Sequence, residues 1–453
     1  MEGMASPVSL KEWERVAAHT HITGLGLDGI KAKPVAAGMV GQTKAREAAG
    51  LVVRLVRKGK FAGRAVLLAG PPGTGKTALA IAMAKELGRD VPVVLLTASE
   101  IYSAEIKKTE FLTQALRRAI GVRIRETRRV YEGKVEELSI RQEPHPYNPY
   151  VKIPVGGTIR LATTDSSQKL SMDQSFAISI LREGVETGDV IQIDVDGGRV
   201  VKLGKSREAA EKEKVDLSAV EVVDVPSGPV MKTKEFVYTV TLHDLDMAHS
   251  RSSVGFFGLL FGGEGRKEIS SETRNAVDEM VKEWVEEGRA EIIPGVVFID
   301  ECSMLDIETF AFLGRAMEQE LSPIIIFATN RGITNVRGTD LRAPHGMPLD
   351  LLDRLLIITT QPYTKEEIRE ILRIRARAEK INISPDTLDY LSEIGASNSL
   401  RYAIQLLAPA AEIAAAESSK EVRREHIERA KELFVDVSRS VQYLREHEEK
   451  MLR

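Results

Sequence analysis

A glycine-rich stretch at residues 70–77, GPPGTGKT, constrains the fold of this chain more than any other feature. The apolar residues before it (64–69, RAVLLA) predict a buried strand, and those after it (78–85, ALAIAMAK) predict a helix. This order is the setting of a phosphate-binding loop, because glycines let backbone N–H groups converge on phosphate oxygens and the helix adds its positive end. The alternative, a Gly/Pro turn before a buried helix, leaves most of the match unexplained.

The residue types in the loop indicate which groups would contact a nucleotide. The Lys76 ammonium would reach the β- and γ-phosphates, and the Thr77 hydroxyl would ligate Mg²⁺. We therefore predict ATP or ADP and Mg²⁺ as cofactors. The expected phosphate-binding set is Gly70, Pro71, Pro72, Gly73, Thr74, Gly75, Lys76, Thr77 and Ala78.

Composition limits the class of protein. The net charge of −3 gives no overall basic field of the kind that attracts nucleic acid. Cys302 is the only cysteine in the sequence, which excludes a disulfide framework and a cysteine-based zinc cluster and fits a reducing compartment. Without a signal-peptide core or an apolar run of membrane-spanning length, we expect a soluble cytoplasmic protein with no membrane partner, or a nuclear one in a eukaryote.

The spacing of the predicted strands indicates an inserted domain. A parallel β/α unit needs about 30 residues, yet far more separate Thr77 from the next buried strand at 296–299. Much of this surplus reads as short alternating strands with glycine-rich turns. We predict an α/β core with a parallel sheet at 1–121 and 241–361, an inserted all-β domain at 122–240, and a helical domain at 362–453, whose first helix begins at a Thr364–Glu367 capping box.

Two acids follow the strand at 296–299, and an amide follows the next strand. Asp300 and Glu301 form a Walker B arrangement, in which Asp300 would bind Mg²⁺ and Glu301 would act as the general base on water. Asn330 would orient that water from the neighbouring strand end. An acidic strand end alone is common, but here it accompanies a phosphate loop.

Two arginines are candidates for phosphate contacts. Arg354 lies between a predicted helix end and a strand, where an isolated arginine is more often a surface salt-bridge partner. Arg401 lies in the first turn of a predicted helix, where a cation opposes the helix dipole. An anionic partner such as a γ-phosphate would explain Arg401, and a nearby carboxylate would explain it equally well.

Longer segments share the pattern of one known family. They are GMVGQ at 38–42, AGRAVLLAGPPGTGKTALA at 62–80, YSAEIKKTE at 102–110, TLHDLD at 241–246, FATNRG at 327–332, and RGTD with PHGMPLDLLDR ending at Arg354. These segments resemble the RuvB-like AAA+ ATPases known as pontin and reptin, and the resemblance runs nearly end to end.

The resemblance implies a P-loop AAA+ core with a helical lid, an OB-like insert and homo-oligomeric hexameric rings that are sometimes stacked. By motif position Asn330 is sensor 1, Arg354 is an arginine finger for the neighbouring subunit and Arg401 is sensor 2. The adenine site implied by the family comprises Gly41, Gln42, Tyr363, Ile371 and Leu400, with His19 and His21 lying over it.

One motif departs from the family pattern. The family commonly has Asp-Glu-Val-His, whereas Cys302 and Ser303 follow the two acids here. Catalysis by Asp300 and Glu301 is unaffected, but a role for the histidine does not carry over. Divergence in the insert and at the termini favours an archaeal member.

The start of the insert is basic. Residues 117–134 hold seven cations and two acids, a balance of +5. A basic strand with an aromatic residue would suit single-stranded nucleic acid, whereas arginines on a solvated edge strand would equally protect against aggregation. The candidate contact residues are Arg123, Arg125, Arg128, Arg129 and Tyr131.

Two functions share this predicted ATPase site. The first is a DNA-associated motor of the helicase type that remodels DNA or DNA-bound complexes. The second is an ATP-regulated scaffold or chaperone for assembling multi-protein or ribonucleoprotein complexes. The expected partners are further copies of the chain, single- or double-stranded DNA or RNA through the insert, and other proteins of such complexes.

Overall fold

The computed structural model describes residues 21–88, 90–103, 105–145, 148–195, 198–212, 222–253, 268–436 and 439–442. The chain falls into two compact units. The first comprises Met1–Val122, Thr239–Glu283 and Ile292–Arg453, and the second comprises Arg123–Tyr238 and Trp284–Glu291. Residues 284–291, which the sequence-based division placed in the core, therefore cluster with the insert.

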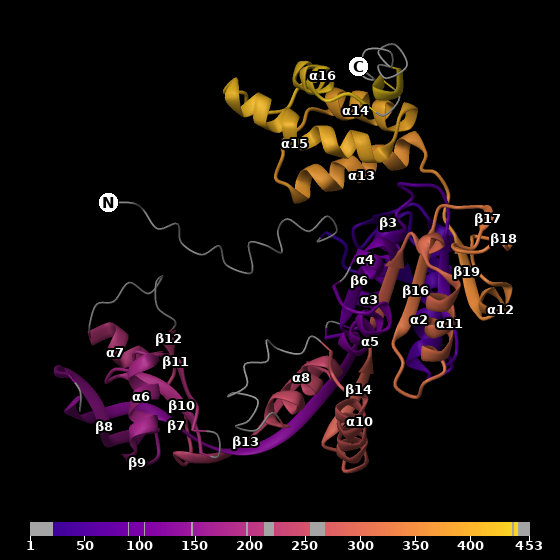
Figure 1. Cartoon of the computed structure of the whole chain (residues 1–453). Coiled ribbons are helices and arrows are strands. Elements are labelled where there is room, and N and C mark those ends of the chain that lie inside the picture. The colour runs from indigo at the N-terminus through magenta and orange to yellow at the C-terminus, as the bar shows by residue number, and fades with distance from the viewer. Residues whose placement is uncertain are drawn as a thin grey trace. The chain divides into compact units, whose positions relative to one another are not determined.

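A five-stranded parallel sheet is the centre of the first unit, as predicted (Figure 1). The strand order is β19-β5-β16-β15-β6, and every residue of β5 and β16 is buried, as expected for strands covered on both faces. Because β16 lies between β5 and β15, the residue after β16 falls between the glycine loop and the acid pair. The strands are β5 (Ala65–Ala69), β6 (Val93–Thr97), β15 (Val296–Asp300), β16 (Ile324–Thr329) and β19 (Leu355–Thr359).

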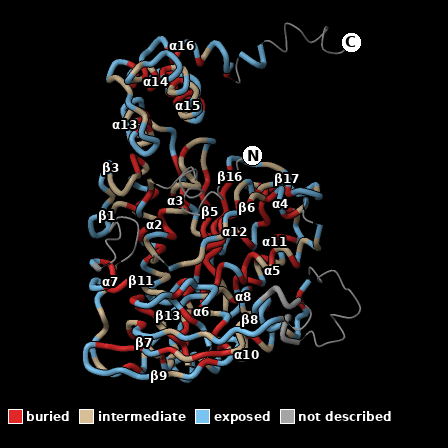
Figure 2. The backbone as a smooth tube through the Cα atoms, turned by 90° about the vertical axis from the view of Figure 1, so that its left-hand side faces the viewer, coloured by how far each residue is buried: buried red, intermediate tan, exposed pale blue. Residues whose placement is uncertain are grey.

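Alternating side chains divide the core into two layers. Leu67 packs into one layer, and its neighbours Val66 and Leu68 pack into the other. The layer around Val66 is covered by α2 (Thr43–Arg57) and α3 (Lys76–Leu87). The opposite layer is covered by α4 (Ala98–Ser103), α5 (Lys108–Arg118), α11 (Ile307–Ala316) and α12 (Leu349–Leu352). Figure 2 shows β5 and β16 as buried segments between these layers.

Further elements also belong to the core. They are β1 (Leu27–Asp28), β2 (Lys31–Ala32), β3 (Val35–Ala36), β4 (Met39–Val40), α8 (Leu242–Ser253), α10 (Ser271–Glu286), η2 (Cys302–Met304), β17 (Ile333–Asn335) and β18 (Arg342–Pro344). Helix α10 ends in three residues, 284–286, that cluster with the insert. Within the described part of the chain, no helix combines the length and the apolar character needed to cross a bilayer.

Between residues 365 and 436, all of which the structure describes, four helices form the C-terminal lid, grouped as one bundle in Figure 1. They are α13 (Lys365–Ala378), α14 (Pro385–Ser397), α15 (Leu400–Ala416) and α16 (Arg424–Leu433). The predicted capping box is confirmed: the Glu367 N–H donates to Thr364 Oγ1 over 3.3 Å, and the Thr364 N–H donates to Glu367 Oε2 over 2.9 Å. The Ser384 and Ser399 side chains cap α14 and α15 by accepting from the N–H groups of Thr387 and Tyr402.

The second unit is built on a largely antiparallel sheet with the strand order β12-β11-β10-β7-β8-β9. Its strands are β7 (Ile120–His145), β8 (Asn148–Ala162), β9 (Ser167–Met172), β10 (Asp189–Asp194), β11 (Val200–Ser206) and β12 (Val222–Val223), with β13 (Met231–Thr241) and β14 (Ala290–Pro294) also paired to β7.

The prediction that the insert is entirely β is wrong. Helices α6 (Gln174–Arg182) and α7 (Arg207–Lys212) interrupt the strands. The start of α6 is fixed locally, because the Asp173 side chain accepts a 2.8 Å hydrogen bond from the Phe176 N–H. Ala177 and Ile180 are buried three residues apart, a helical spacing that nine residues are too few to reveal clearly.

Candidate functional site

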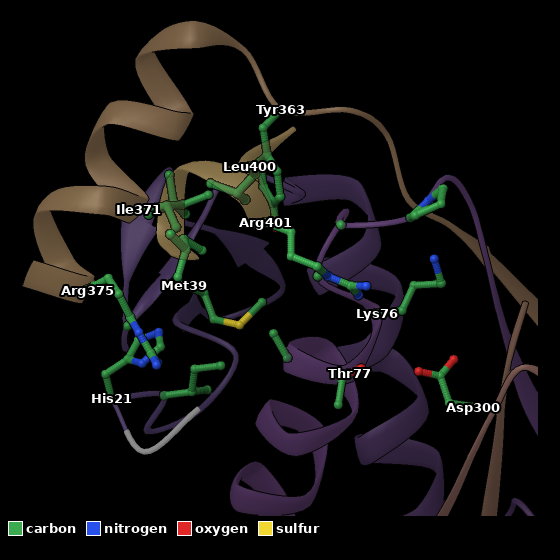
Figure 3. A pocket seen from close by; sticks show the side chains of 18 of the residues that line it. His21, Met39, Lys76, Thr77, Asp300, Tyr363, Ile371, Arg375, Leu400 and Arg401 are labelled. Carbon is green, nitrogen blue, oxygen red and sulfur yellow. The ribbon is translucent and has the colours of Figure 1, made fainter. Parts of the chain in front are cut away.

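A cavity of about 440 Å³ lies in the first unit (Figure 3). Its walls come from the segment 21–40, from the glycine loop with the start of α3, and from lid helices α13 and α15. This volume is in the range of small-molecule sites. The predicted residues that line it are His21, Pro72, Gly73, Gly75, Lys76, Thr77, Ala78, Asp300, Glu301, Asn330, Tyr363, Ile371, Leu400 and Arg401.

The glycine loop has the backbone that a phosphate cradle requires. Gly73 and Gly75 adopt left-handed φ values of 75° and 81°, which glycine reaches without strain. Gly75 also lacks space for a side chain, because an added Cβ would lie 2.5 Å from the Tyr363 hydroxyl. Helix α3 begins at Lys76, so its unpaired N–H groups face the cavity and favour an anion.

Lys76 is the cation of the loop. Its Nζ donates to the carbonyls of Gly70 and Pro71 over 2.9 and 2.8 Å. Burial lowers the pKa of the Lys76 ammonium, while Asp300 raises it and Arg401 lowers it further. Arg401, in the first turn of α15, therefore acts on the same space as Lys76 from the lid, and Figure 3 shows its side chain extending toward that lysine.

The acid pair follows β15 with an unusual backbone. Asp300 ends the strand, and Glu301 has a left-handed φ of 54°, an unfavourable conformation for a residue with a side chain. The Glu301 N–H donates to Asp300 Oδ1 over 2.8 Å. Strain of this kind costs about 1–3 kcal/mol and often occurs at active sites. Glu301 is exposed and, like Asn330, lines the cavity.

Oxygen ligands suitable for Mg²⁺ are present beside the loop. The Thr77 side chain and the Asp300 carboxylate line the same cavity, and Figure 3 shows both below Lys76. Magnesium prefers oxygen ligands and usually combines one or two protein groups with phosphate oxygens and water. The residues therefore fit Mg²⁺ bound together with a nucleotide.

Cys302 belongs to the core rather than to the reacting groups. Its side chain is fully buried, with Sγ 4.0 Å from Met347 Sδ. Burial raises the pKa of the Cys302 thiol, which keeps it protonated and unreactive. Cys302, one of the two residues that depart from the family motif, thus fills a space between β15 and the loop that follows β18.

The opposite end of the cavity is apolar with a polar edge. A purine suits such walls, because its faces are apolar and its edges carry hydrogen-bonding groups. Burial lowers the pKa of the His21 imidazole, and Arg375 lowers it further, so His21 is neutral at pH 7. His19 lies outside the described residues. The apolar lining comprises Ile22, Met39, Val40, Ala78, Ile371, Leu400 and Ile404.

Some lining residues were missed from the sequence: Ile22, Gly38, Met39, Val40, Arg375, Ile404 and Gln405. Three of them had a usable signal. Arg375 lies one turn beyond Ile371 on α13, and Ile404 and Gln405 lie one turn beyond Leu400 and Arg401 on α15. Residues four apart share a helix face, so the predicted members implied these three.

Gly41 and Gln42 do not line the cavity, contrary to the expected adenine site. Gln42 Nε2 donates to the Gln361 carbonyl over 2.5 Å, and the Gln361 N–H donates back to Gln42 Oε1 over 3.1 Å. Gly41 approaches Glu367 so closely that an added Cβ would lie 2.1 Å from Oε1. These two residues fasten the N-terminal segment to the start of the lid. Gly70, Pro71 and Thr74 belong to the glycine loop but are also absent from the lining.

Arg354 does not line the cavity. Its Nη1 atom is 2.5 Å from Glu318 Oε1, and both side chains are about half exposed, at 45% and 55%. An exposed pair of this kind contributes little to stability. The Arg354 side chain therefore lies at the surface of the first unit.

The wall formed by residues 21–40 depends on a buried arginine. Arg46 has an exposed fraction of 0%, and burial lowers the pKa of its guanidinium. Its nitrogens donate to four carbonyls over 2.7–3.1 Å, those of Leu25, Gly26, Lys33 and Gly41. One side chain thus supplies hydrogen-bond donors to backbone carbonyls between Leu25 and Gly41.

Replacing Arg46 with methionine should destabilise the protein by about 3 kcal/mol, because buried carbonyls lose their donors. The measurement is the free energy of unfolding in denaturant without nucleotide. Lys44→Met, at an exposed position on the same helix, should change it by less than about 0.5 kcal/mol. Equal effects of the two substitutions would contradict this account.

The predicted basic strand is balanced by carboxylates. Arg123 and Arg125 lie 3.1 and 4.0 Å from Glu291, and Arg128 lies 2.8 Å from Asp194. Arg128 also donates to Glu126 over 2.7 Å. Three arginines therefore face three carboxylates (Glu291, Asp194 and Glu126). The positive charge on this surface is smaller than the charge balance counted along the sequence.

The other two candidate residues differ in exposure. Arg129 is exposed on β7. Tyr131 is only partly exposed and packs against the hydrophobic core of the insert. A base could stack on Tyr131 only through the part of its ring that the core leaves open.

Comparison with protein-family models gives two matches. Residues 15–366 match a model described as the TIP49 P-loop domain, and residues 371–436 match one described as the TIP49 AAA-lid domain. The first match runs through the insert as well as the core. The archaeal assignment stays a prediction.

Proposed function

Because this chain belongs to the TIP49 family of RuvB-like AAA+ ATPases, we propose that it hydrolyses ATP with Mg²⁺ in a homo-oligomeric ring and uses the cycle to remodel DNA or DNA-bound complexes. The observation that carries the ATPase is the joining of the glycine loop, the acid pair and a lid arginine around one cavity. Nucleotide bound there would contact both the core and the lid, so the state of the nucleotide would influence the lid.

Each of these cavity residues has a separate role in the proposed hydrolysis of ATP. The loop amides and Lys76 bind the β- and γ-phosphates, and Arg401 adds positive charge from the lid. Thr77 and Asp300 hold Mg²⁺, which neutralises phosphate charge when bound. Glu301 accepts a proton from the attacking water, and Asn330 orients that water.

Assembly would complete the site. Arg354 is outside the cavity but about half exposed, so it is free to meet the nucleotide of a neighbouring subunit in a ring. A guanidinium suits this task, since it stays ionised and forms two parallel hydrogen bonds to phosphate oxygens. Its pair with Glu318 would then hold the side chain ready for the neighbour.

DNA contact would use the exposed cations of the insert. Arg125 and Arg129 are exposed on β7, so their guanidinium groups present positive charge at the surface of the insert. Such a local charge would bind nucleic acid weakly and with strong salt dependence. In a ring, every subunit would contribute the same local charge, and contacts made at the same time would strengthen binding.

A second function is favoured by the balance of charge on β7. Because three carboxylates face Arg123, Arg125 and Arg128, the insert has a weaker positive field than its sequence indicates. A mixed surface of this kind suits protein partners. The chain would then be an ATP-regulated scaffold or chaperone that assembles large complexes without unwinding nucleic acid.

One experiment tests both functions. ATP hydrolysis and strand unwinding are measured in parallel with the assembled protein, with and without single-stranded DNA, and with Lys76→Ala as the inactive control. A motor should unwind duplex with ATP and hydrolyse faster when strands are present. ATP hydrolysis without unwinding or stimulation supports the scaffold, and no hydrolysis by the wild-type protein contradicts the ATPase itself.

The double substitution Arg123→Gln, Arg125→Gln should weaken single-strand binding and reduce its salt dependence, because each lost phosphate contact lowers the slope of log K against log salt by about 0.7. Fluorescence anisotropy at several salt concentrations measures both. Arg182→Gln, an exposed arginine on α6 of the insert, is the matched control. Unchanged binding and slope in the double variant would remove β7 as the contact.

A further inference from the structure

The residue that joins the sheet to the lid, Thr360, also forms a hydrogen bond to the glycine loop. Thr360 directly follows β19, and its N–H donates to the Ala69 carbonyl over 2.9 Å. Its Oγ1 lies 2.6 Å from Thr74 Oγ1. Both threonines are almost fully buried, at 4% and 3% exposure, so water does not replace either hydroxyl.

The hydrogen on each hydroxyl can be assigned. The Thr74 hydroxyl donates to the Pro71 carbonyl over 2.8 Å, and a hydroxyl has only one hydrogen to donate. Thr360 must therefore donate to Thr74 Oγ1. The Pro71 carbonyl also accepts from Lys76 Nζ over 2.8 Å. Hydrogen bonds thus connect Thr360 through Thr74 and Pro71 to the lysine, and the two bonds from Thr360 to Thr74 and from Thr74 to Pro71 run in one direction, so they strengthen each other.

The fit between the linker and the loop is close. A Cβ on Gly70 would lie 2.3 Å from Thr360 Oγ1 and 2.6 Å from its carbonyl oxygen. The Tyr363 hydroxyl donates to the Thr74 carbonyl over 3.3 Å, and burial raises the pKa of Tyr363 to about 12, which keeps this donor protonated. Thr360 and Tyr363 therefore hold Thr74 by its side chain and by its backbone.

We propose that Thr360 is a positioning residue for nucleotide binding: its hydroxyl orients Thr74 and so holds the glycine loop with its amides converged. The inference rests on the proposed ATPase function. Thr360 itself touches no substrate, and its effect is to keep the loop organised before nucleotide arrives. Loss of this hydroxyl leaves the Thr74 oxygen without a donor and the 71–75 turn free to relax.

The test compares Thr360→Val with Thr360→Ser. Valine keeps the size but removes the hydroxyl, so the Kd for a fluorescent ADP analogue should rise about tenfold. Serine keeps the donor and should restore the Kd to within about twofold. Thr359→Val, at the exposed preceding position of β19, is the matched control and should bind as the wild type does. ATP turnover should show KM rising more than kcat falls.

A second variant covers the case in which Thr360→Val does not fold. Thr74→Val breaks the same chain and should weaken binding by a similar factor, and combining the two should add little further loss, since both remove one interaction. Wild-type binding by Thr360→Val or Thr74→Val, or failure of serine to restore it, overturns the inference. If the wild-type protein itself binds no ADP, the proposed function fails, and the inference fails with it.

Discussion

Replacement of Glu301 with glutamine should leave nucleotide binding intact and slow ATP hydrolysis by about 10²–10⁴-fold. An amide keeps the shape of the side chain but cannot accept the proton of the attacking water. The left-handed backbone at Glu301 and its bond to Asp300 Oδ1 should persist, because both involve main-chain atoms of residue 301. Equilibrium binding of ATP and single-turnover hydrolysis measure the two properties separately.

Two further substitutions serve as controls for this result. Lys76→Ala should lose binding, because it removes the cation at the β- and γ-phosphates. Glu308→Gln, an exposed acid that pairs with Lys108, should hydrolyse ATP as the wild type does. Comparable hydrolysis by Glu301→Gln and the wild-type protein would show that another group is the base.

Subunits that carry Arg354→Ala and subunits that carry Lys76→Ala should each be nearly inactive and should regain part of the activity when mixed. An arginine finger contributes about 10³–10⁵ in rate. In a mixed ring, some interfaces join an intact Lys76 site to an intact Arg354 from the other variant. ATPase activity across a series of mixing ratios measures the recovery.

The pair between Arg354 and Glu318 supplies the control. If Arg354 only formed this bridge within its own subunit, Glu318→Gln would reduce activity as much as Arg354→Ala does. For a finger that acts on the neighbour, Glu318→Gln should retain most of the activity, since an exposed ion pair contributes at most about 1 kcal/mol. Exchange of labelled subunits without any recovery at any ratio would argue against action in trans.

Predictions from the sequence were most accurate for features that a short segment of neighbouring residues determines. The glycine loop at 70–77, the capping box at Thr364 and the acid-tipped strand at 296–299 each follow from neighbouring residues, and all three are present. Parallel strands bring their carboxyl ends to one edge of a sheet, which explains why residues far apart in the chain, such as Lys76 and Asp300, were expected together.

Contacts that depend on three-dimensional packing were not predictable. No local pattern indicates that Gln42 exchanges hydrogen bonds with Gln361 or that Thr360 holds Thr74, since about three hundred residues separate each pair. Two of the carboxylates that face arginines of β7, Glu291 and Asp194, come from the other strands β14 and β10. A count of charge along one strand cannot include partners that only folding brings near.

The two chain segments that lead into and out of the insert lie side by side in the core. A Cβ on Gly121 would come 3.3 Å from the Thr239 methyl group, and β13 pairs with β7. A short linker could join two such points at little entropic cost, because closing a small loop orders few residues. The core could therefore keep its sequence while the insert is exchanged, lengthened or lost, and related ATPases could diverge in their partners through this one position without altering the catalytic machinery.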